Sequence, residues 1–119
     1  MEYGSDRVLR MIEETGANLR LAAERFAAGG SADESLTLTA DTIREVLGMD
    51  PDVFVSMSAP SMVTLVEVSG LDDRLVSRVA ESLLLEADIL QSEGDLLEAA
   101  ARREQATAIL DSIDPAQAN

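Results

Sequence analysis

The chain contains no cysteine, no histidine, no tryptophan and no lysine. Without histidine, no side chain titrates near neutral pH at its ordinary pKa, which excludes Ser-His-Asp and Cys-His catalysis. The same absences exclude structural zinc sites and the Glu-x-x-His ligands of di-iron bundles. Without cysteine there are no disulfides, the mark of oxidising compartments. We therefore expect a protein that is not an enzyme and holds no metal and no cofactor.

Basic residues are scarce: the chain has 9 arginines and 23 acidic residues, which gives a formal net charge of −14. This charge argues against nucleic acid and against anionic membranes, which both require basic surfaces. It permits a basic protein partner, although a soluble acidic surface needs no partner to explain it. No apolar run is long enough to span a membrane, and the start of the chain does not resemble a signal peptide. These features predict a cytoplasmic protein.

Aromatic residues make up only 3% of the chain, whereas hydrophobic residues make up 46%. The core must therefore be aliphatic, which suits helix packing. A length of 119 residues corresponds to one domain. We expect residues 1–119 to form a single all-α domain, a compact bundle of five or six helices, with frayed backbone at 1–4 and 115–119.

The first predicted helix covers residues 5–28. Apolar or small residues recur at steps of three and four and form one stripe: Leu9, Ile12, Gly16, Leu19, Ala23 and Phe26. Glycine inside a helix costs about 1 kcal/mol relative to alanine. Gly16 within this stripe therefore indicates the close approach of another helix.

Two further helices have clear start signals. Ser31 and Glu34 form a capping box ahead of a second helix that Gly48 ends. Its predicted inner face consists of Leu36, Ala40, Ile43 and Leu47. Asp50 and Pro51 then fit the cap and first position of a short helix, whose inward residues would be Val53, Phe54 and Met57.

Residues 53–68 allow two interpretations. Their β-branched residues favour a hairpin of two strands, 53–57 and 62–68. A lone two-stranded hairpin is marginally stable, however, and the rest of the chain is helical. We therefore favour a short helix that begins at Pro60 and ends at Gly70.

The last two helices form a hairpin around Gly94. The first is capped by Asp72 and runs to about Glu93, with an apolar face of Leu75, Val76, Val79, Leu83, Leu84, Ala87 and Leu90. The second begins at Asp95 and ends at Pro115. Its predicted inner face consists of Leu96, Ala99, Ala106, Leu110 and Ile113.

Aligned on Gly94 and Asp95, this hairpin resembles a tetratricopeptide repeat. The packing positions of that motif fall on Leu83, Ala87, Leu90, Ala99 and Ala106. Glu86 stands at a place that is usually apolar, and Arg103 at one that is usually aromatic. Stable repeat arrays need several units, and no second copy is evident. The resemblance implies at most one degenerate unit, which serves packing and docking.

The whole chain is also similar to a family of small, uncharacterised, all-helical bacterial proteins. The likeness rests on an opening Arg-x-Met-Ile-Glu helix, here Arg10-Met11-Ile12-Glu13 with Val8 and Leu9 ahead of it, and on the closing hairpin. This family has a domain of unknown function. The resemblance supports the helical fold and implies no activity.

Polar clusters have ordinary interpretations in this chain. Asp50, Pro51 and Asp52 fit a helix start, and they lack the ligand spacing of a calcium loop. Four carboxylates near the hairpin turn are expected to be solvated: Glu86, Asp88, Glu93 and Asp95. Four arginines are expected to pair internally, with Arg78 meeting Glu81 and Arg102 meeting Glu98: Arg74, Arg78, Arg102 and Arg103.

Leu85 stands in the middle of an otherwise polar stripe that includes Arg78 and Glu81. An isolated exposed leucine is ordinary, but a helix that is apolar nearly all round is often covered on two sides. Leu85 is either covered by its own fold or forms an interface with Arg78 and Glu81 at its rim.

Taken together, these features predict a protein–protein interaction or adaptor domain. Its partner could be a second copy of the chain, which would form a homodimer. The alternative is a small acidic inhibitor or immunity-type protein that binds a basic partner. Salt-sensitive binding would favour the alternative, whereas salt-insensitive, apolar association would favour the interaction domain.

Overall fold

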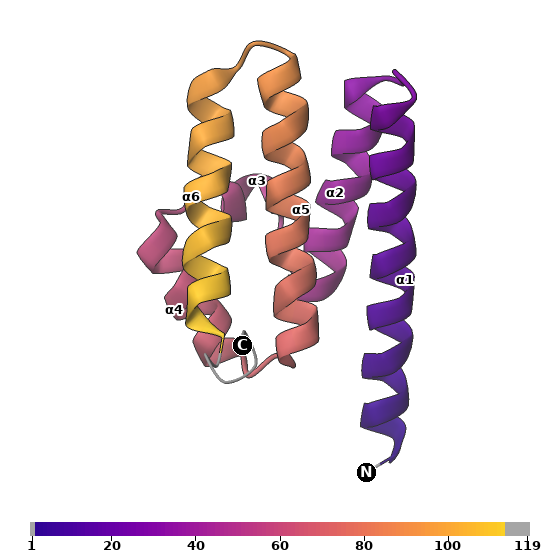
Figure 1. Cartoon of the computed structure of the whole chain (residues 1–119). Coiled ribbons are helices and arrows are strands. Elements are labelled where there is room, and N and C mark those ends of the chain that lie inside the picture. The colour runs from indigo at the N-terminus through magenta and orange to yellow at the C-terminus, as the bar shows by residue number, and fades with distance from the viewer. Residues whose placement is uncertain (1, 114–119) are drawn as a thin grey trace.

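The computed structural model describes residues 2–113 of the chain, and this part is all helical (Figure 1). Its six helices are α1 (Glu2–Ala27), α2 (Ala32–Leu47), α3 (Pro51–Val55), α4 (Ala59–Ser69), α5 (Asp73–Ser92) and α6 (Leu96–Ser112). The predicted all-α bundle is confirmed. Residues 53–68 contribute α3 and α4, so the helical interpretation of this segment is correct. The predicted helix end at Pro115 and the frayed residues 115–119 lie outside the described residues.

The helix boundaries follow local signals in the sequence. The side chains of Ser31, Asp50, Asp72 and Asp95 each accept a hydrogen bond from a backbone N–H in the first turn of α2, α3, α5 and α6, respectively. Gly48 and Gly70 end α2 and α4 in the left-handed conformation, which glycine adopts without strain. α1 begins at Glu2 and so includes residues 2–4, for which we expected frayed backbone.

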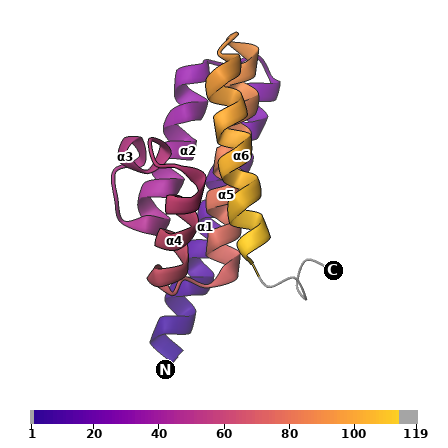
Figure 2. The same cartoon turned by 90° about the vertical axis from the view of Figure 1, so that its left-hand side faces the viewer.

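α5 and α6 form a hairpin in which they run antiparallel side by side, and the other helices cover only part of it (Figures 1 and 2). α2 and α1 pack on one side of α5, and α4 packs against α6. The short α3 lies next to α2. The N-terminal end of α1 projects beyond the other helices in both views.

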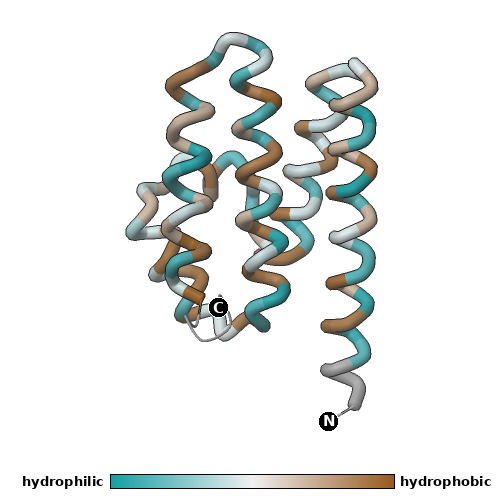
Figure 3. Tube along the Cα trace, in the orientation of Figure 1, coloured by the Kyte–Doolittle hydropathy of each residue, from teal (hydrophilic) through white to brown (hydrophobic). Residues whose placement is uncertain are grey.

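The core is aliphatic apart from Phe54, which is fully buried. The largest of its other fully buried apolar side chains come from α2, α4, α5 and α6: Ile43, Met62, Val79, Leu83, Ile89 and Ile109. Each such side chain contributes about 1.5–3 kcal/mol of burial free energy. The tube in Figure 3 shows hydrophobic segments that recur along the helices between hydrophilic ones.

The buried face of α1 is rotated relative to our prediction. Leu9 is 45% exposed and Ala23 is exposed, whereas Thr15 and Ala22 are fully buried. Thr15 tolerates burial because its hydroxyl donates to the Met11 carbonyl oxygen at 2.7 Å. A hydroxyl that satisfies itself on its own helix behaves as a small core residue.

In α2, too, small polar residues are buried where we predicted apolar ones. Ser35, Thr39 and Thr42 are fully buried with Ile43, while the predicted residues Leu36, Ala40 and Leu47 are only half-buried. The Ser35 hydroxyl donates to the Ala22 carbonyl oxygen of α1 at 3.2 Å. Small polar side chains therefore let α1 and α2 approach closely.

Four residues that we expected inside lie at the surface. Val53 is 53% exposed, Leu96 63%, Leu110 38% and Leu84 37%. Each lies on a helix that buries a different side against the core. Of the predicted tetratricopeptide packing positions, Leu83, Ala87, Ala99 and Ala106 are buried and Leu90 is half-buried.

Gly16 lies where α1 meets the side chain of Arg78 from α5. A Cβ atom at this position would lie 2.7 Å from Arg78 Nη2 and 3.1 Å from its Cζ. The space beside Gly16 is thus filled by a guanidinium group, and the predicted close approach of another helix stays a prediction.

Candidate functional site

Arg78, one of the three residues predicted for an interface, joins α5 to α1. Its Nε donates to the Ile12 carbonyl oxygen at 3.2 Å. Its Nη1 lies 3.1 Å from Oε2 of Glu81, which confirms the predicted pair. Only 25% of the Arg78 side chain is exposed. The hydrogen bond to α1 gives Arg78 a structural role that the sequence did not predict.

Leu85 is half-buried and lies two turns after Arg78. Both residues are therefore on the side of α5 that is near α1. Glu81 is exposed between them. The fold of one chain therefore accounts for part of the apolar character of Leu85. The interface formed by Leu85, Arg78 and Glu81 stays a prediction.

The most unusual polar group is the buried carboxylate of Glu86 in the middle of α5. Glu86 is only 5% exposed. Its Oε1 accepts a hydrogen bond from Arg102 Nε of α6 at 3.0 Å, and its Oε2 accepts one from Thr39 Oγ1 of α2 at 2.8 Å. Arg102 is also largely buried, and its Nη1 pairs with Glu98 at 3.0 Å. We expected Glu86 to be solvated, and this expectation is wrong.

Burial raises the pKa of the Glu86 carboxyl above its ordinary value, because the charged form loses its hydration. The hydrogen bonds from Thr39 and Arg102 and the positive charge of Arg102 oppose this rise. The negative charge of Asp52 adds to it. The buried Glu86 and the exposed Asp52 thus both line the space beside one guanidinium, that of Arg102.

A pocket of about 160 Å³ opens next to this ion pair. Four helices supply its walls. The apolar lining comes from Leu36 and Ala40 of α2, Pro51 and Val55 of α3, and Leu90 of α5. The polar lining consists of Glu86, Arg102 and Asp52. We call this the Glu86 pocket. It combines an aliphatic lining with a buried charged pair, in a volume smaller than that of most small-ligand sites.

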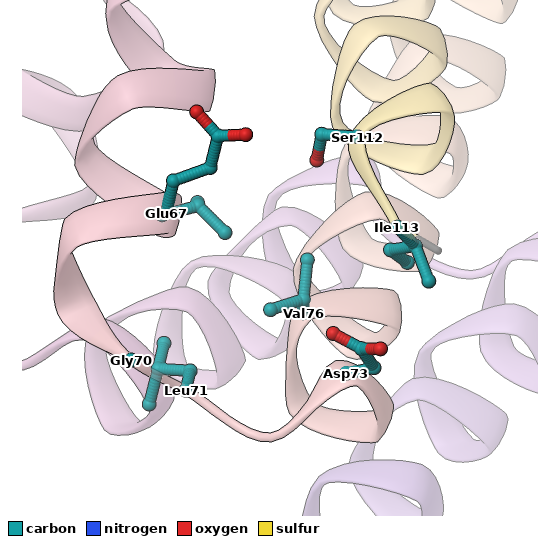
Figure 4. Close-up of a pocket in the computed structure, with 8 residues that line it drawn as sticks. Glu67, Gly70, Leu71, Asp73, Val76, Ser112 and Ile113 are labelled. Atoms are coloured by element: carbon teal, nitrogen blue, oxygen red, sulfur yellow. The ribbon is translucent and has the colours of Figure 1, made fainter. Parts of the chain in front are cut away.

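A second pocket of about 160 Å³ lies between the end of α4, the start of α5 and the end of α6 (Figure 4). Its polar side chains are Glu67, Asp73 and Ser112, and Val76 and Ile113 are among its apolar ones. Glu67 is exposed, and Asp73 and Ser112 are half-buried. Without a buried charge, this pocket is a weaker candidate for a specific site.

A third pocket, of about 280 Å³, separates α6 from the connection between α3 and α4. Gln105 forms part of its wall, and Gln105 Nε2 donates to the carbonyl oxygens of Val55 and Met57, each at 3.0 Å. The buried Oε1 of Gln105 has no hydrogen-bond partner within residues 2–113. Gln105 thus fixes the α3–α4 connection to α6.

The first turn of α6 presents two adjacent leucines to solvent. Leu96 is 63% exposed and Leu97 is 87% exposed. Exposed acidic residues flank them on both sides: Glu93, Asp95 and Glu98. We call these five residues the hairpin-tip surface. Figure 3 shows a hydrophobic segment at this end of α6.

The four arginines Arg74, Arg78, Arg102 and Arg103 are paired internally, as predicted. Arg74 lies 3.0 Å from Asp72, and Arg103 lies 3.1 Å from Asp88, in addition to the pairs of Arg78 and Arg102. The hydrogen bonds from the Arg74 side chain and backbone lower the pKa of the Asp72 carboxyl. Each of these arginines is therefore occupied by a carboxylate of the protein itself.

Two classes of site are missing from the described part of the chain. Within residues 2–113, no three Asp or Glu side chains gather in a way that could hold a metal ion. No helix in this range combines the length and the apolar character needed to cross a membrane.

No family model, no curated protein and no solved structure matches the chain. The resemblances to the tetratricopeptide repeat and to the helical bacterial family therefore stay predictions.

Proposed function

We propose that this protein is a non-catalytic protein–protein interaction or adaptor domain. The observation that carries the proposal is the pair of exposed leucines, Leu96 and Leu97, on the hairpin-tip surface. Scattered exposed apolar residues are normal in monomeric proteins. Two neighbouring leucines on the first turn of a well-formed helix are a stronger signal, because they expose apolar area that a partner would bury.

The surroundings of the leucines support a partner with basic groups. Glu93, Asp95 and Glu98 surround them, and the chain carries a formal charge of −14. A second copy of this surface would bring like charges together, whereas apolar side chains framed by arginine or lysine would complement it. We therefore propose that the hairpin-tip surface binds a different protein, whose contact surface has a basic rim. Self-association, where it occurs, would use the surface around Leu85.

A second candidate function follows from the net charge. A small inhibitor or immunity-type protein that neutralises a basic enzyme would use the same acidic surface. Both partners would carry basic groups, so the two candidates differ in how strongly binding depends on salt and how strongly it depends on the leucines. Binding that weakens strongly between low and high salt favours the inhibitor, and binding that depends mainly on the leucines favours the adaptor.

Site-specific photocrosslinking tests the proposal. A photoreactive phenylalanine analogue replaces Leu97, and the protein is irradiated in its native cells. A matched protein carries the analogue at Val68 of α4, which is 77% exposed and also apolar. We expect one discrete crosslinked partner from position 97 and none from position 68. Crosslinks of equal intensity from both positions, or none from position 97, would contradict the proposal.

A further inference from the structure

We propose that the Glu86 pocket binds an aliphatic cation, a short alkyl chain that ends in an ammonium or guanidinium group. The apolar walls would enclose the alkyl chain, and the cation would lie between the carboxylates of Glu86 and Asp52. This inference is independent of the hairpin-tip surface.

The charge balance of the pocket favours a cation. Glu86, Asp52 and Arg102 all line it, so two negative groups share one positive group. Arg102 is already engaged with Glu86 and with Glu98. A second cation would relieve the repulsion between the carboxylates, whereas an anion would increase it.

Glu86 retains hydrogen-bonding capacity for such a group. Each of its two oxygens accepts one hydrogen bond, from Arg102 or from Thr39. A carboxylate oxygen has two lone pairs, so each can accept one further bond. An ammonium or guanidinium group supplies several N–H donors for these positions.

The burial of the ion pair is hard to explain by stability alone. Taking two charges out of water costs several kcal/mol per ion, and an apolar pair of similar volume is often equally stable or better. Glu86 and Arg102 nevertheless occupy the middle of the hairpin next to a pocket. Recognition of a charged group gives this arrangement a use.

The size of the pocket limits the ligand. A volume of about 160 Å³ is similar to that of cavities that hold one benzene molecule, about 150 Å³. The pocket therefore suits a chain of about four carbons with its cationic head. A free alkylamine has this chemistry, and so does the lysine or arginine side chain of a basic protein.

Methyl NMR titration tests the inference on the full-length protein at pH 7.5. The probes are n-butylammonium and two controls of the same length, n-butanol and butyrate. We expect saturable shifts for n-butylammonium at the methyl groups of Leu36, Val55 and Leu90, with a Kd of about 1–10 mM. Both controls should bind at least about tenfold more weakly.

Asp52→Asn provides the matched variant, because Asp52 is exposed and its removal leaves the core unchanged. We expect it to weaken n-butylammonium about three- to tenfold. Asp111→Asn removes the same charge at an exposed position of α6, nine residues from Arg102, and should leave the Kd unchanged.

The peptide acetyl-Gly-Lys-Gly-amide identifies the source of the cation. Binding as tight as that of n-butylammonium assigns the pocket to a protein side chain, and much weaker binding assigns it to a free amine.

Three results would overturn the inference. They are the absence of saturable shifts with n-butylammonium, equal binding of n-butanol or butyrate, and an unchanged Kd in Asp52→Asn. Failure of this titration would leave the hairpin-tip proposal intact, since that proposal rests on different residues.

Discussion

Arg102 of α6 reaches back across the hairpin to Glu86 of α5, with Nε and Oε1 3.0 Å apart and both side chains largely buried. Thr39 of α2 completes the arrangement through Oε2. The three residues connect α2, α5 and α6 by charge-assisted hydrogen bonds, which are stronger than neutral ones. A polar contact of this kind favours one packing of the helices over alternatives that leave the charges unpaired.

The stability of the protein should depend on pH through Glu86. Its folded-state pKa lies above the ordinary value of 4.5. The folded protein therefore binds more protons than the unfolded chain between these two values. The contribution of Glu86 is fully present below pH 4.5 and is lost as the pH rises through the raised pKa. Wild-type protein should thus lose stability relative to Glu86→Gln over this range, as measured by urea unfolding of both proteins.

The comparison with Glu86→Gln isolates one group, because all other titrating residues are common to both proteins. The groups that face Glu86 are Arg102 of α6, Thr39 of α2 and Asp52 of α3. A wild-type protein that instead gains stability over Glu86→Gln as the pH rises would show that Arg102 outweighs the effect of burial.

Gly16→Ala should destabilise the protein by about 1 kcal/mol, mainly because the Arg78 side chain must shift and lose a hydrogen bond. Alanine raises helix propensity, but its methyl group would displace the Arg78 guanidinium and disturb the hydrogen bond to Ile12. In an Arg78→Ala background the same substitution should cost less or stabilise. Thermal unfolding of the four proteins measures this coupling, and equal effects in both backgrounds would show that Arg78 does not limit the space at Gly16.

Gln105→Met should destabilise the protein by about 1–3 kcal/mol, because the carbonyl groups of two half-buried residues, Val55 and Met57, lose their donor. Hydrogen exchange should accelerate mainly at residues 55–59, which comprise the α3–α4 connection and one helix residue on either side of it. The control is Glu104→Gln, a change at the exposed neighbour on the same helix. Unchanged exchange at 55–59 in Gln105→Met would contradict the fixing role of Gln105.

Self-association through Leu85 predicts a dimer at micromolar concentration that tolerates salt, because the centre of the contact is apolar. Leu85→Glu should give folded monomers, since it places like charge at that centre. Sedimentation velocity and circular dichroism on both proteins measure this. A monomeric wild-type protein would show that Leu85 forms no interface. An unfolded Leu85→Glu variant would show that Leu85 belongs to the core.

Helix number and helix ends could be predicted because their signals are local. Ser31, Asp50, Asp72 and Asp95 cap the helices that follow them, and Gly48 ends α2. Such signals depend on residues within one turn of the boundary, so the sequence alone contains them.

The buried faces were harder to predict, because hydrophobicity alone ranks Thr15, Ser35 and Thr39 as surface residues. Each is fully buried. The hydroxyls of Thr15 and Ser35 donate to backbone carbonyl oxygens, and the hydroxyl of Thr39 donates to the Glu86 carboxylate. The buried faces that apolar periodicity predicts for α1 and α2 are therefore rotated by about one residue from the faces that the structure buries.

The Glu86 pocket could not be predicted, because its parts are distant in sequence. Thr39 lies 47 residues before Glu86, and Arg102 lies 16 residues after it. The one available signal was a glutamate at a usually apolar position of the tetratricopeptide-like pattern. That departure marked the site, but only the fold brings α2, α3 and α6 around it.

The affinity of the crosslinked partner for purified variants tests the proposed function most directly. Titration calorimetry compares the wild type with Leu97→Ser and with the matched surface variant Val68→Ser. We predict that Leu97→Ser raises the Kd at least about tenfold, equivalent to about 1.4 kcal/mol, without a change in melting temperature. Val68→Ser should leave the Kd within about twofold, as expected for a residue outside the contact. A Leu97→Ser protein that binds the partner as tightly as the wild type would contradict the assignment of the hairpin-tip surface to protein binding.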